Sequence, residues 1–409
     1  MGDVPISMIY WVWLSAALGA GNKKFSSLIE KYKTAKAIFD LGEKELSLNS
    51  FLSKKEIEKL KNKNLFFAKK TLETCKEDNI KIIPFNDKQY PQILRELENP
   101  PVCLYVLGEF FDFDNNPFIC IVGKRDCSDY GKKVAWSLAA RLSLGGITVL
   151  SGGARGIDTA AHKGALDVGA KTVAVLACGI NYDYLKANRE LRETISKNGC
   201  LISEYPPSSP VFKENFALRN RLLAALTYGT VIVESGEGSG ATITANHAVE
   251  QGKEVFVITG KPDDPNYYGN NRLLRDGAKP VIEANDIFLE YISYFGDKIL
   301  PNKANETNLS KVFAEKYNRQ KTDTKAKLVN KENDKPKMQE KLQKIGNIEN
   351  LPLSKNAKVV YNCIDNNLFI LDDLLSTGLS FDELLTAVTE LELSGLVKAV
   401  PGGRYSVLR

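Results

Sequence analysis

The sequence has little of what metal-binding, secreted or membrane-spanning proteins need. Its 409 residues include only two histidines, His162 and His247, and seven cysteines, of which no pair has CxxC spacing. A structural zinc site requires about four such ligands close together, so we expect no metal. The number of cysteines is odd and the sequence shows no signal-peptide pattern, so we expect reduced thiols in a cytoplasmic protein. The apolar run at residues 8–20 is shorter than the roughly 20 residues of a membrane span and predicts a buried helix.

Three motifs of common enzymes are also absent. The chain has no GxSxG nucleophile elbow, no GxxxxGK[ST] phosphate loop and no strict GxGxxG after an apolar strand. Asp158, Glu204 and Glu234 are the best acid/base candidates, but at such positions a carboxylate more often caps a helix or holds a neighbouring arginine. His162 is interpreted as a packing residue rather than a base. We therefore predict no catalytic residue, no cofactor and no enzymatic activity.

The charge balance is mild, and the chain divides by composition into four regions. Fifty-five basic against 50 acidic side chains give a net charge of +5, which permits a nucleic-acid partner without requiring one. Residues 1–75 are predicted to form short helices, residues 76–294 an α/β domain with its core at 117–290, residues 295–352 a flexible basic linker, and residues 353–409 a winged helix. The linker is rich in Lys, Asn, Glu and Asp and has few large apolar side chains to offset chain entropy.

The two terminal regions each have two interpretations. Gly19-Ala20-Gly21 separates two helical patterns, which is the outline of a small helix-hairpin-helix or SAM-like domain. The turn amides of such a hairpin can hold a DNA phosphate, or the turn is a tight corner that packs on the next domain. Near the other end, helical patterns precede two short strand patterns around Pro401-Gly402-Gly403, which is the outline of a winged helix. Its helices are acidic, which favours protein docking over DNA reading.

The middle region repeats the pattern of strand, glycine-containing loop and helix. Its apolar runs lie at residues 118–123, 147–150, 172–177, 200–203, 230–235, 254–259 and 280–283. The runs are continuous rather than alternating, as in strands that are buried on both faces. This pattern predicts a doubly wound, mostly parallel, extended Rossmann-like sheet, whose ligands bind beyond the carboxyl ends of the strands.

Five loops should therefore meet at one edge of the sheet. Their glycines let the backbone approach a ligand closely, their helix starts direct unpaired N–H groups at an anion, and arginine presents a fork that fits phosphate oxygens. The basic side chains are spread too widely for one small ligand. The residues that we predict to bind nucleic acid are Lys124, Arg125, Ser128, Gly152, Gly153, Arg155, Gly156, Lys186, Asn188, Lys213, Arg219, Asn220, Arg221, Ser239 and Gly240.

At these loops the sequence resembles the DprA/Smf family of DNA-processing proteins. The resemblance rests on IVGKRDCSDYG, SGGARGIDTAAHKGAL, NFALRNRLLAAL and SGATITANHAVEQGKEVFVITG, which occur in the family's order. It implies a protein that binds single-stranded DNA, protects incoming strands and loads RecA recombinase during DNA-mediated transformation, and that forms homodimers through the α/β domain. By residue-to-residue correspondence it implies contacts from Arg125, Lys186 and Lys213, and from the two arginines of the RNR motif, Arg219 and Arg221.

The chain departs from the family pattern at three places. Lys124 replaces a serine, which adds charge to the loop. Leu185 replaces the proline before Lys186, so the shape of that loop is less certain, and Ala217 replaces the proline after Phe216. None of these changes removes a basic contact.

Two other functions remain open at this point. A nucleotide phosphoribohydrolase on a similar fold would use the same cradle with Glu204 or Glu234 acting on the ribose, but such enzymes need PGGxGTxxE, and the loop here is SGEGSGATITANHA. Alternatively, the chain is an adaptor that binds a nucleotide in the α/β domain and a protein through the winged helix.

Overall fold

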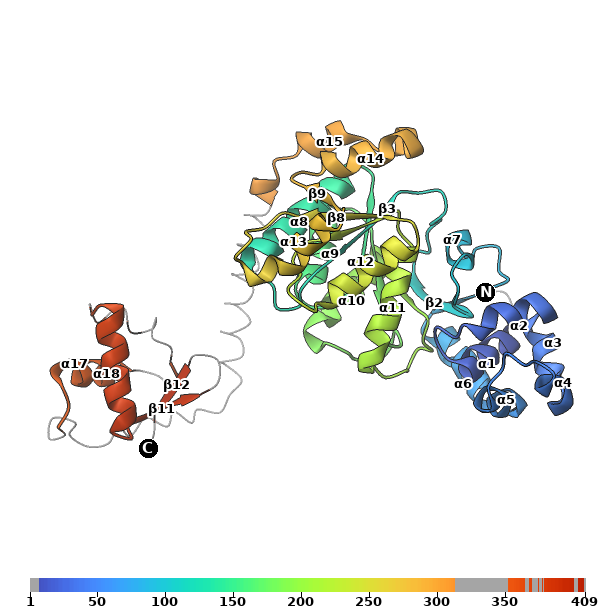
Figure 1. The fold of residues 1–409 in the computed structure, drawn as a ribbon, viewed down its shortest axis with the longest axis horizontal. Coiled ribbons are helices and arrows are strands. Elements are labelled where there is room, and N and C mark those ends of the chain that lie inside the picture. The colour runs from blue at the N-terminus through green and yellow to red at the C-terminus, as the bar shows by residue number, and fades with distance from the viewer. Residues whose placement is uncertain are drawn as a thin grey trace. The chain divides into compact units, whose positions relative to one another are not determined.

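The computed structural model describes residues 7–312, 352–364, 368–369, 374, 377, 379–400 and 404–407. It consists of two compact units, Met1–Gln320 and Lys321–Arg409, which are described separately below (Figure 1). Within the described ranges, no helix is both long and apolar enough to cross a bilayer.

A nine-stranded sheet forms the centre of the first unit. Its strands are β1 (Lys81–Pro84), β2 (Cys103–Gly108), β3 (Phe118–Val122), β4 (Thr148–Ser151), β5 (Thr172–Leu176), β6 (Gly199–Ser203), β7 (Gly229–Ile232), β8 (Glu254–Ile258) and β9 (Lys279–Val281). Their spatial order is β1-β2-β6-β5-β4-β3-β7-β8-β9, and the seven strands from β6 to β9 in this order run parallel. β1 and β2 run antiparallel to their neighbours. The predicted mostly parallel α/β sheet is confirmed.

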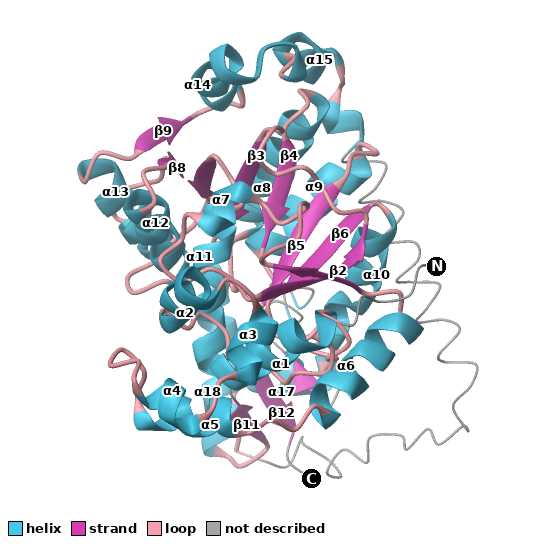
Figure 2. Ribbon diagram, turned by 90° about the vertical axis from the view of Figure 1, so that its right-hand side faces the viewer, coloured by secondary structure: helices cyan, strands magenta, loops and turns pink. Residues whose placement is uncertain are grey.

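Helices cover both faces of this sheet (Figure 2). They are α7 (Gln92–Arg95), α8 (Asp129–Leu144), α9 (Ile157–Asp167), α10 (Arg189–Lys197), α11 (Lys213–Ala225), α12 (Gly240–Glu250), α13 (Tyr268–Arg275) and α14 (Asn285–Phe295), with short 3-10 turns η1 (Lys186–Asn188) and η2 (Pro265–Tyr267). In β3, Ile119 and Ile121 join the core under α8, α9 and α14, whereas Cys120 and Val122 join the core under α11 and α12. Both faces of β3 are therefore buried, which explains its continuous apolar sequence.

Six short helices precede the sheet: α1 (Met8–Leu18), α2 (Lys24–Tyr32), α3 (Ala35–Asp40), α4 (Glu43–Ser47), α5 (Lys54–Lys61) and α6 (Phe66–Glu77). They share a hydrophobic core with β2, β5 and β6, to which Trp11, Phe25, Tyr105 and Leu201 contribute. α1 is the buried helix that the apolar run predicts, with residues 11–15 all buried.

The Gly19–Gly21 turn between α1 and α2 is a packed corner. The Gly21 N–H donates to Glu204 Oε1 at 2.9 Å, and the Gly21 carbonyl accepts from Asn99 at 3.3 Å. A Cβ at Gly21 would lie 2.3 Å from Leu218 in α11. Of the two interpretations of this turn, the structure agrees with the corner that packs on the α/β domain. The Gly21 N–H, which a phosphate would need, already donates to the Glu204 carboxylate.

The folded unit extends further than the composition predicted. Residues 295–312, which we assigned to the linker, include η3 (Gly296–Lys298) and α15 (Pro301–Glu306). Ile299 and Ala304 are buried in the core under α8, and Leu309 is buried against Trp136 of α8. The predicted start of the linker at residue 295 is therefore wrong. Residues 295–312 belong to the folded unit, because three apolar side chains of this otherwise polar segment are buried against it. The rest of the predicted linker, residues 313–351, lies outside the described residues.

The second unit is a winged helix, as predicted. It contains α17 (Lys355–Cys363), β10 (Leu368–Phe369), α18 (Phe381–Leu393), β11 (Val397–Val400) and β12 (Arg404–Val407), with antiparallel strands in the order β10-β12-β11. α17 and α18 pack through Val360, Leu384 and Val388. Most of the middle helical pattern, residues 371–378, and the turn at 401–403 lie outside the described residues. Two acidic side chains of α18 have structural roles, since Glu383 caps α18 and Glu390 binds Ser354 at the start of α17.

Candidate nucleic-acid interface

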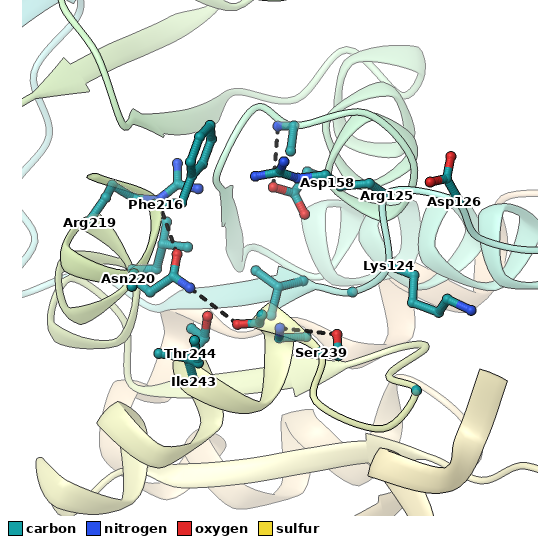
Figure 3. A pocket seen from close by; sticks show the side chains of 18 of the residues that line it. Lys124, Arg125, Asp126, Asp158, Phe216, Arg219, Asn220, Ser239, Ile243 and Thr244 are labelled. Atoms are coloured by element: carbon teal, nitrogen blue, oxygen red, sulfur yellow. Dashed lines mark hydrogen bonds between the residues drawn. The ribbon is translucent and has the colours of Figure 1, made fainter. Parts of the chain in front are cut away.

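A pocket of about 930 Å³ opens at the carboxyl edge of the sheet. It lies beside β3, where the strand order reverses: β4, β5 and β6 follow on one side, and β7, β8 and β9 on the other. Open α/β sheets bind ligands at such a switch point. The loops after β3 and β7 and the helices α11 and α12 line the pocket (Figure 3).

The structure brings seven of the 15 predicted binding residues to this pocket. They are Lys124, Arg125, Lys213, Arg219, Asn220, Ser239 and Gly240. The other eight, which do not line it, are Ser128, Gly152, Gly153, Arg155, Gly156, Lys186, Asn188 and Arg221. The predicted residues that line the pocket come from the segments after β3, β6 and β7, whereas none of those predicted in the loops after β4 and β5 line it.

Arg125 is an exposed cation in the lining of the pocket, as is Lys213. Its guanidinium carbon lies 4.2 Å from the centre of the Phe216 ring, a cation–π contact. Phe216 in turn packs against Tyr184 at a ring separation of 5.4 Å, so the loops after β3 and β5 meet at α11. Within the described residues Arg125 forms no ion pair, whereas the neighbouring Arg155 is bound to Asp126 at 2.7 Å. The Arg125 charge is thus positioned by an aromatic ring and left available to an anion.

Arg219 lies at the base of the pocket and is held by the backbone. It is only 4% exposed, and its Nη1 donates to the carbonyls of Gly152, at 2.7 Å, and Val175. Burial lowers the pKa of Arg219, and burial raises the pKa of the neighbouring Asp158, although the arginine opposes that rise. A Cβ at Gly152 would lie 2.5 Å from the guanidinium, so this glycine makes room for the arginine. The principal role of Arg219 is therefore to tie the ends of β4 and β5 together.

Arg221 does not face the pocket. Its Nη2 donates to Glu204 Oε2 at 2.5 Å, and both side chains are 4% exposed. Glu204 is the carboxylate that also accepts the Gly21 N–H. The direct DNA contact that the resemblance implied for Arg221 is excluded in this structure, because α11 turns this side chain toward the N-terminal helices.

Several predicted residues shape the loops instead of facing solvent. Ser128 caps α8 and donates to the buried Glu234, which also accepts from the Ser128 N–H at 2.9 Å. Asn188 donates to the Gly153 carbonyl at 3.3 Å and to Thr159 Oγ1 at 2.9 Å, joining the loops after β4 and β5. These contacts fix the loop backbones around the pocket.

Lys186 is exposed and follows the carboxyl end of β5, but it lies outside the pocket lining. The preceding Leu185, at the position where the family has proline, has a φ of 56°. A positive φ is uncommon for a leucine and is not available to proline, whose ring fixes a negative φ, so this backbone conformation requires a residue other than proline. Lys186 stays a candidate for a flanking contact.

Sequence reasoning missed part of the pocket wall. Phe212, directly before α11, is 59% exposed and lines the pocket. Ile243 and Thr244 of α12 line it as well (Figure 3). An exposed phenylalanine beside Lys213 is the kind of residue that stacks on a base. Its position in the sequence, next to the predicted contact Lys213, could have identified it as a binding residue.

The carboxylates considered for catalysis all have structural partners. Glu204 binds Arg221 and Gly21, Glu234 binds Ser128, and Asp158 accepts from the Ala154 N–H at 3.3 Å. His162 is fully buried beside Thr172, with Nδ1 2.9 Å from its hydroxyl, and burial lowers the pKa of His162 to about 3. The packing interpretation of His162 agrees with these contacts.

We expect Gly156→Ala to disturb the Arg125 loop. Gly156 has a φ of +82°, and a Cβ there would lie 2.4 Å from the carbonyl oxygens of Lys124 and Arg125. The left-handed backbone alone costs about 1–2 kcal/mol for alanine, and the backbone overlap adds to it. The free energy of unfolding should fall by more than about 2 kcal/mol in denaturant titrations.

Gly169→Ala is the matched control, because Gly169 has a φ of +76° but nothing within 4 Å of its Cβ position. Equal losses for the two variants would show that the contact between Gly156 and the Arg125 loop contributes nothing.

Residues 81–292 match the family model of DNA recombination-mediator protein A, and residues 350–403 match that of the DprA winged helix domain. DNA processing protein DprA of Bacillus subtilis (strain 168) is 36% identical over 215 residues, which are 53% of this chain and 72% of the relative. Protein Smf of Escherichia coli (strain K12) is 31% identical over 334 residues, 81% of this chain and 79% of the relative.

The fold is also that of a solved relative. The X-ray structure of DNA processing protein A (DprA) from Streptococcus pneumoniae aligns with a TM-score of 0.61 and 29% identity, covering 71% of this chain and 99% of that chain. Family model, relatives and structure agree with the sheet and the winged helix described above, and the chain belongs to the DNA recombination-mediator protein A (DprA/Smf) family.

Proposed function

We propose that the pocket binds single-stranded DNA with little sequence preference. The observation that carries this proposal is Arg125, an exposed guanidinium held on Phe216 at the mouth of a pocket and free of an ion pair among the described residues. Lys213 and Phe212 stand next to each other at the start of α11, on the same pocket. Cations alternating with exposed rings suit a strand whose phosphates and unstacked bases are both accessible.

The rings would contribute as much as the charges. Stacking of a base on an aromatic side chain is worth about 1–3 kcal/mol and tolerates any base, since every base has a π face. Phe212 is exposed, so it has a face that a base can reach, whereas Phe216 is half-buried between Arg125 and Tyr184 and holds the arginine in place. In a duplex the base faces are stacked on one another, and such rings favour single strands.

The proposed cellular role follows the family. Relatives named DNA processing protein support a role in processing DNA during transformation. We propose that this chain protects incoming single strands, delivers them to RecA and acts as a cytoplasmic homodimer. These steps rest on the resemblance at the pocket loops. Two pockets in a dimer would bind one strand by avidity.

No observation favours nucleotide cleavage. Glu204 and Glu234, the carboxylates such an enzyme would use, are each bound to structural partners. α12 begins GATITANH and has no glutamate before its last position, Glu250.

The test is a salt series with oligothymidine and a matched duplex. We expect the single strand to bind more tightly, and the logarithm of its association constant to fall linearly with the logarithm of salt concentration, by about 0.7 per phosphate contacted. Incubation with nucleoside monophosphates serves as the control for the alternative and should release no base. Equal affinity for duplex and single strand, or an affinity independent of salt, would contradict the proposal.

A further inference from the structure

A second aromatic surface lies far from the pocket in the sequence, at the start of α6. Phe66 is 72% exposed and Phe67 is 51% exposed. Among the described residues, the only other phenylalanine in this exposed class is Phe212 at the pocket. We call Phe66, Phe67, Lys69 and Lys70 the Phe66–Phe67 surface, all four of which are exposed.

The two rings are not needed to fold α6. Its buried residues are Ala68, Thr71 and Cys75, which define the face that packs on the other helices. Phe66 lies three and four positions before Lys69 and Lys70, so these side chains share the outer face of the helix. The Phe66 N–H is already bound by the Asn64 side chain at 2.8 Å, so the start of the helix is capped without the rings. The exposed rings therefore need an explanation other than core packing.

The surface is strongly and locally basic. Residues 54–70 contain seven lysines and two glutamates, a net charge of +5 that equals the net charge of the whole chain. Both glutamates have partners: Glu56 closes the cap of α5 at Ser53, and Glu58 pairs with Lys61 at 2.9 Å. Within the described part of the chain, the six other lysines form no ion pair: Lys54, Lys55, Lys59, Lys63, Lys69 and Lys70.

Lys63 shows how one of these charges is positioned. Its ammonium lies 5.1 Å from the ring centre of Trp13 and 5.3 Å from that of Phe39. The Trp13 indole N–H donates to the neighbouring Asn62 carbonyl at 2.9 Å, which anchors the segment between α5 and α6. The Lys63 ammonium is itself buried at these two rings, so it helps to order the segment below Phe66 and Phe67 and does not belong to the exposed surface.

We propose that the Phe66–Phe67 surface is a second contact site for single-stranded DNA. Two adjacent rings can stack on bases while the unpaired lysines bind the phosphates between them. The choice of single-stranded DNA as the ligand is taken from the proposed function of the pocket, so this inference rests on that proposed function. An acidic protein would also match the positive charge, because its carboxylates would pair with the lysines. It would not explain why two phenylalanine rings are exposed beside them. The Gly19–Gly21 turn plays no part, because its amide is bound to Glu204.

The test compares the double variant Phe66→Ser/Phe67→Ser with Leu48→Ser. Leu48 is 79% exposed in the same helical region and lies outside the surface, so it controls for loss of an exposed apolar side chain. Binding is measured with oligothymidines from about 6 to about 40 nucleotides, a range that starts near the footprint of a single site. We expect the double variant to bind the shortest strand like the parent and the longest about tenfold more weakly, with Leu48→Ser unchanged throughout.

Two further measurements, the salt slope and hydrogen exchange, test the proposal without relying on affinity. Lys69→Ser/Lys70→Ser should lower the salt slope for the long strand by about 1.4, at 0.7 per phosphate contact, and leave that for the short strand unchanged. Hydrogen exchange of residues 62–74 should slow when the long strand binds and not when the short one does. Unfolding midpoints equal to that of the parent show that the variants are folded.

The outcomes separate this inference from the proposed function. If the double variant binds every length like the parent while Arg125→Ala binds weakly, the second site is overturned and the pocket stands. If Arg125→Ala has no effect but the double variant does, the pocket fails and the second site stands. Should the double variant instead lose binding only to an acidic protein or to anionic vesicles, the assignment to DNA is wrong.

Discussion

Arg125→Ala is expected to weaken binding of oligothymidine by roughly 30-fold. A hydrogen bond to a charged group contributes about 1.5–3 kcal/mol, and 2 kcal/mol corresponds to about 30-fold in a dissociation constant. Arg125 is the exposed guanidinium of the pocket and rests on Phe216, so it reaches a phosphate at little entropic cost. The salt slope should also fall by about 0.7, the value for one phosphate contact of a single strand, and the loss should be similar for different sequences. Fluorescence anisotropy across a salt series measures both quantities.

Two controls give this prediction its specificity. Lys171→Ala removes one positive charge just before β5 begins, at the opposite end of the strand, where Lys171 pairs with Glu109 at 2.6 Å. It should leave the affinity unchanged. Arg125→Lys keeps the charge but loses the flat guanidinium, and should bind with intermediate affinity. An Arg125→Ala protein with the parent's affinity and slope would remove this residue from the interface.

Glu204→Gln is expected to reduce the free energy of unfolding by about 3–5 kcal/mol. Removing one partner of a buried ion pair leaves the other charge without compensation, and that is the usual size of the effect. Here the abandoned charge is Arg221, which is 3% exposed and whose Nε and Nη1 have no hydrogen-bond partner. The glutamine Oε1 can still accept from the Gly21 N–H, so the variant isolates the loss of the Arg221 contact. Urea titration followed by circular dichroism measures the loss.

The control for this prediction is an exposed pair. Glu109→Gln breaks the ion pair with Lys171, in which the lysine side chain is 52% and the glutamate side chain 59% exposed. This variant should change the free energy of unfolding by less than about 1 kcal/mol. A double variant, Glu204→Leu/Arg221→Met, should recover most of the stability, because replacing both charges leaves none unpaired. Glu204→Gln unfolding at the parent's urea concentration would show that the pair contributes nothing.

The sheet could be predicted from the sequence because its signal is local. Each parallel strand is buried on both faces, so a continuous apolar run such as residues 118–122 identifies it without knowledge of its neighbours. Loops that follow parallel strands must meet at one edge, and this rule alone brought Lys124, Arg125, Lys213 and Ser239 to one pocket.

The roles of the RNR arginines could not be predicted in the same way. Charge and motif indicated contact with phosphate for both Arg219 and Arg221, but α11 is buried along residues 219–225 on more than one side. One arginine meets backbone carbonyls and the other meets Glu204, and only the packing of α11 shows this. The sequence analysis did not single out Phe212, because nothing in the sequence distinguishes an exposed phenylalanine from a buried one, and the structure shows that it is exposed.

α11 is the wall that the pocket and the N-terminal helices have in common. Phe216 on this helix faces the pocket, whereas Leu218 touches Gly21 and Arg221 reaches the carboxylate bound to the same glycine. A displacement of the helix by either neighbour would be transmitted to the other. Removal of the amino-terminal helices would expose Leu218 and leave Glu204 without the Gly21 N–H, so the helix that carries Phe216 would lose part of its support.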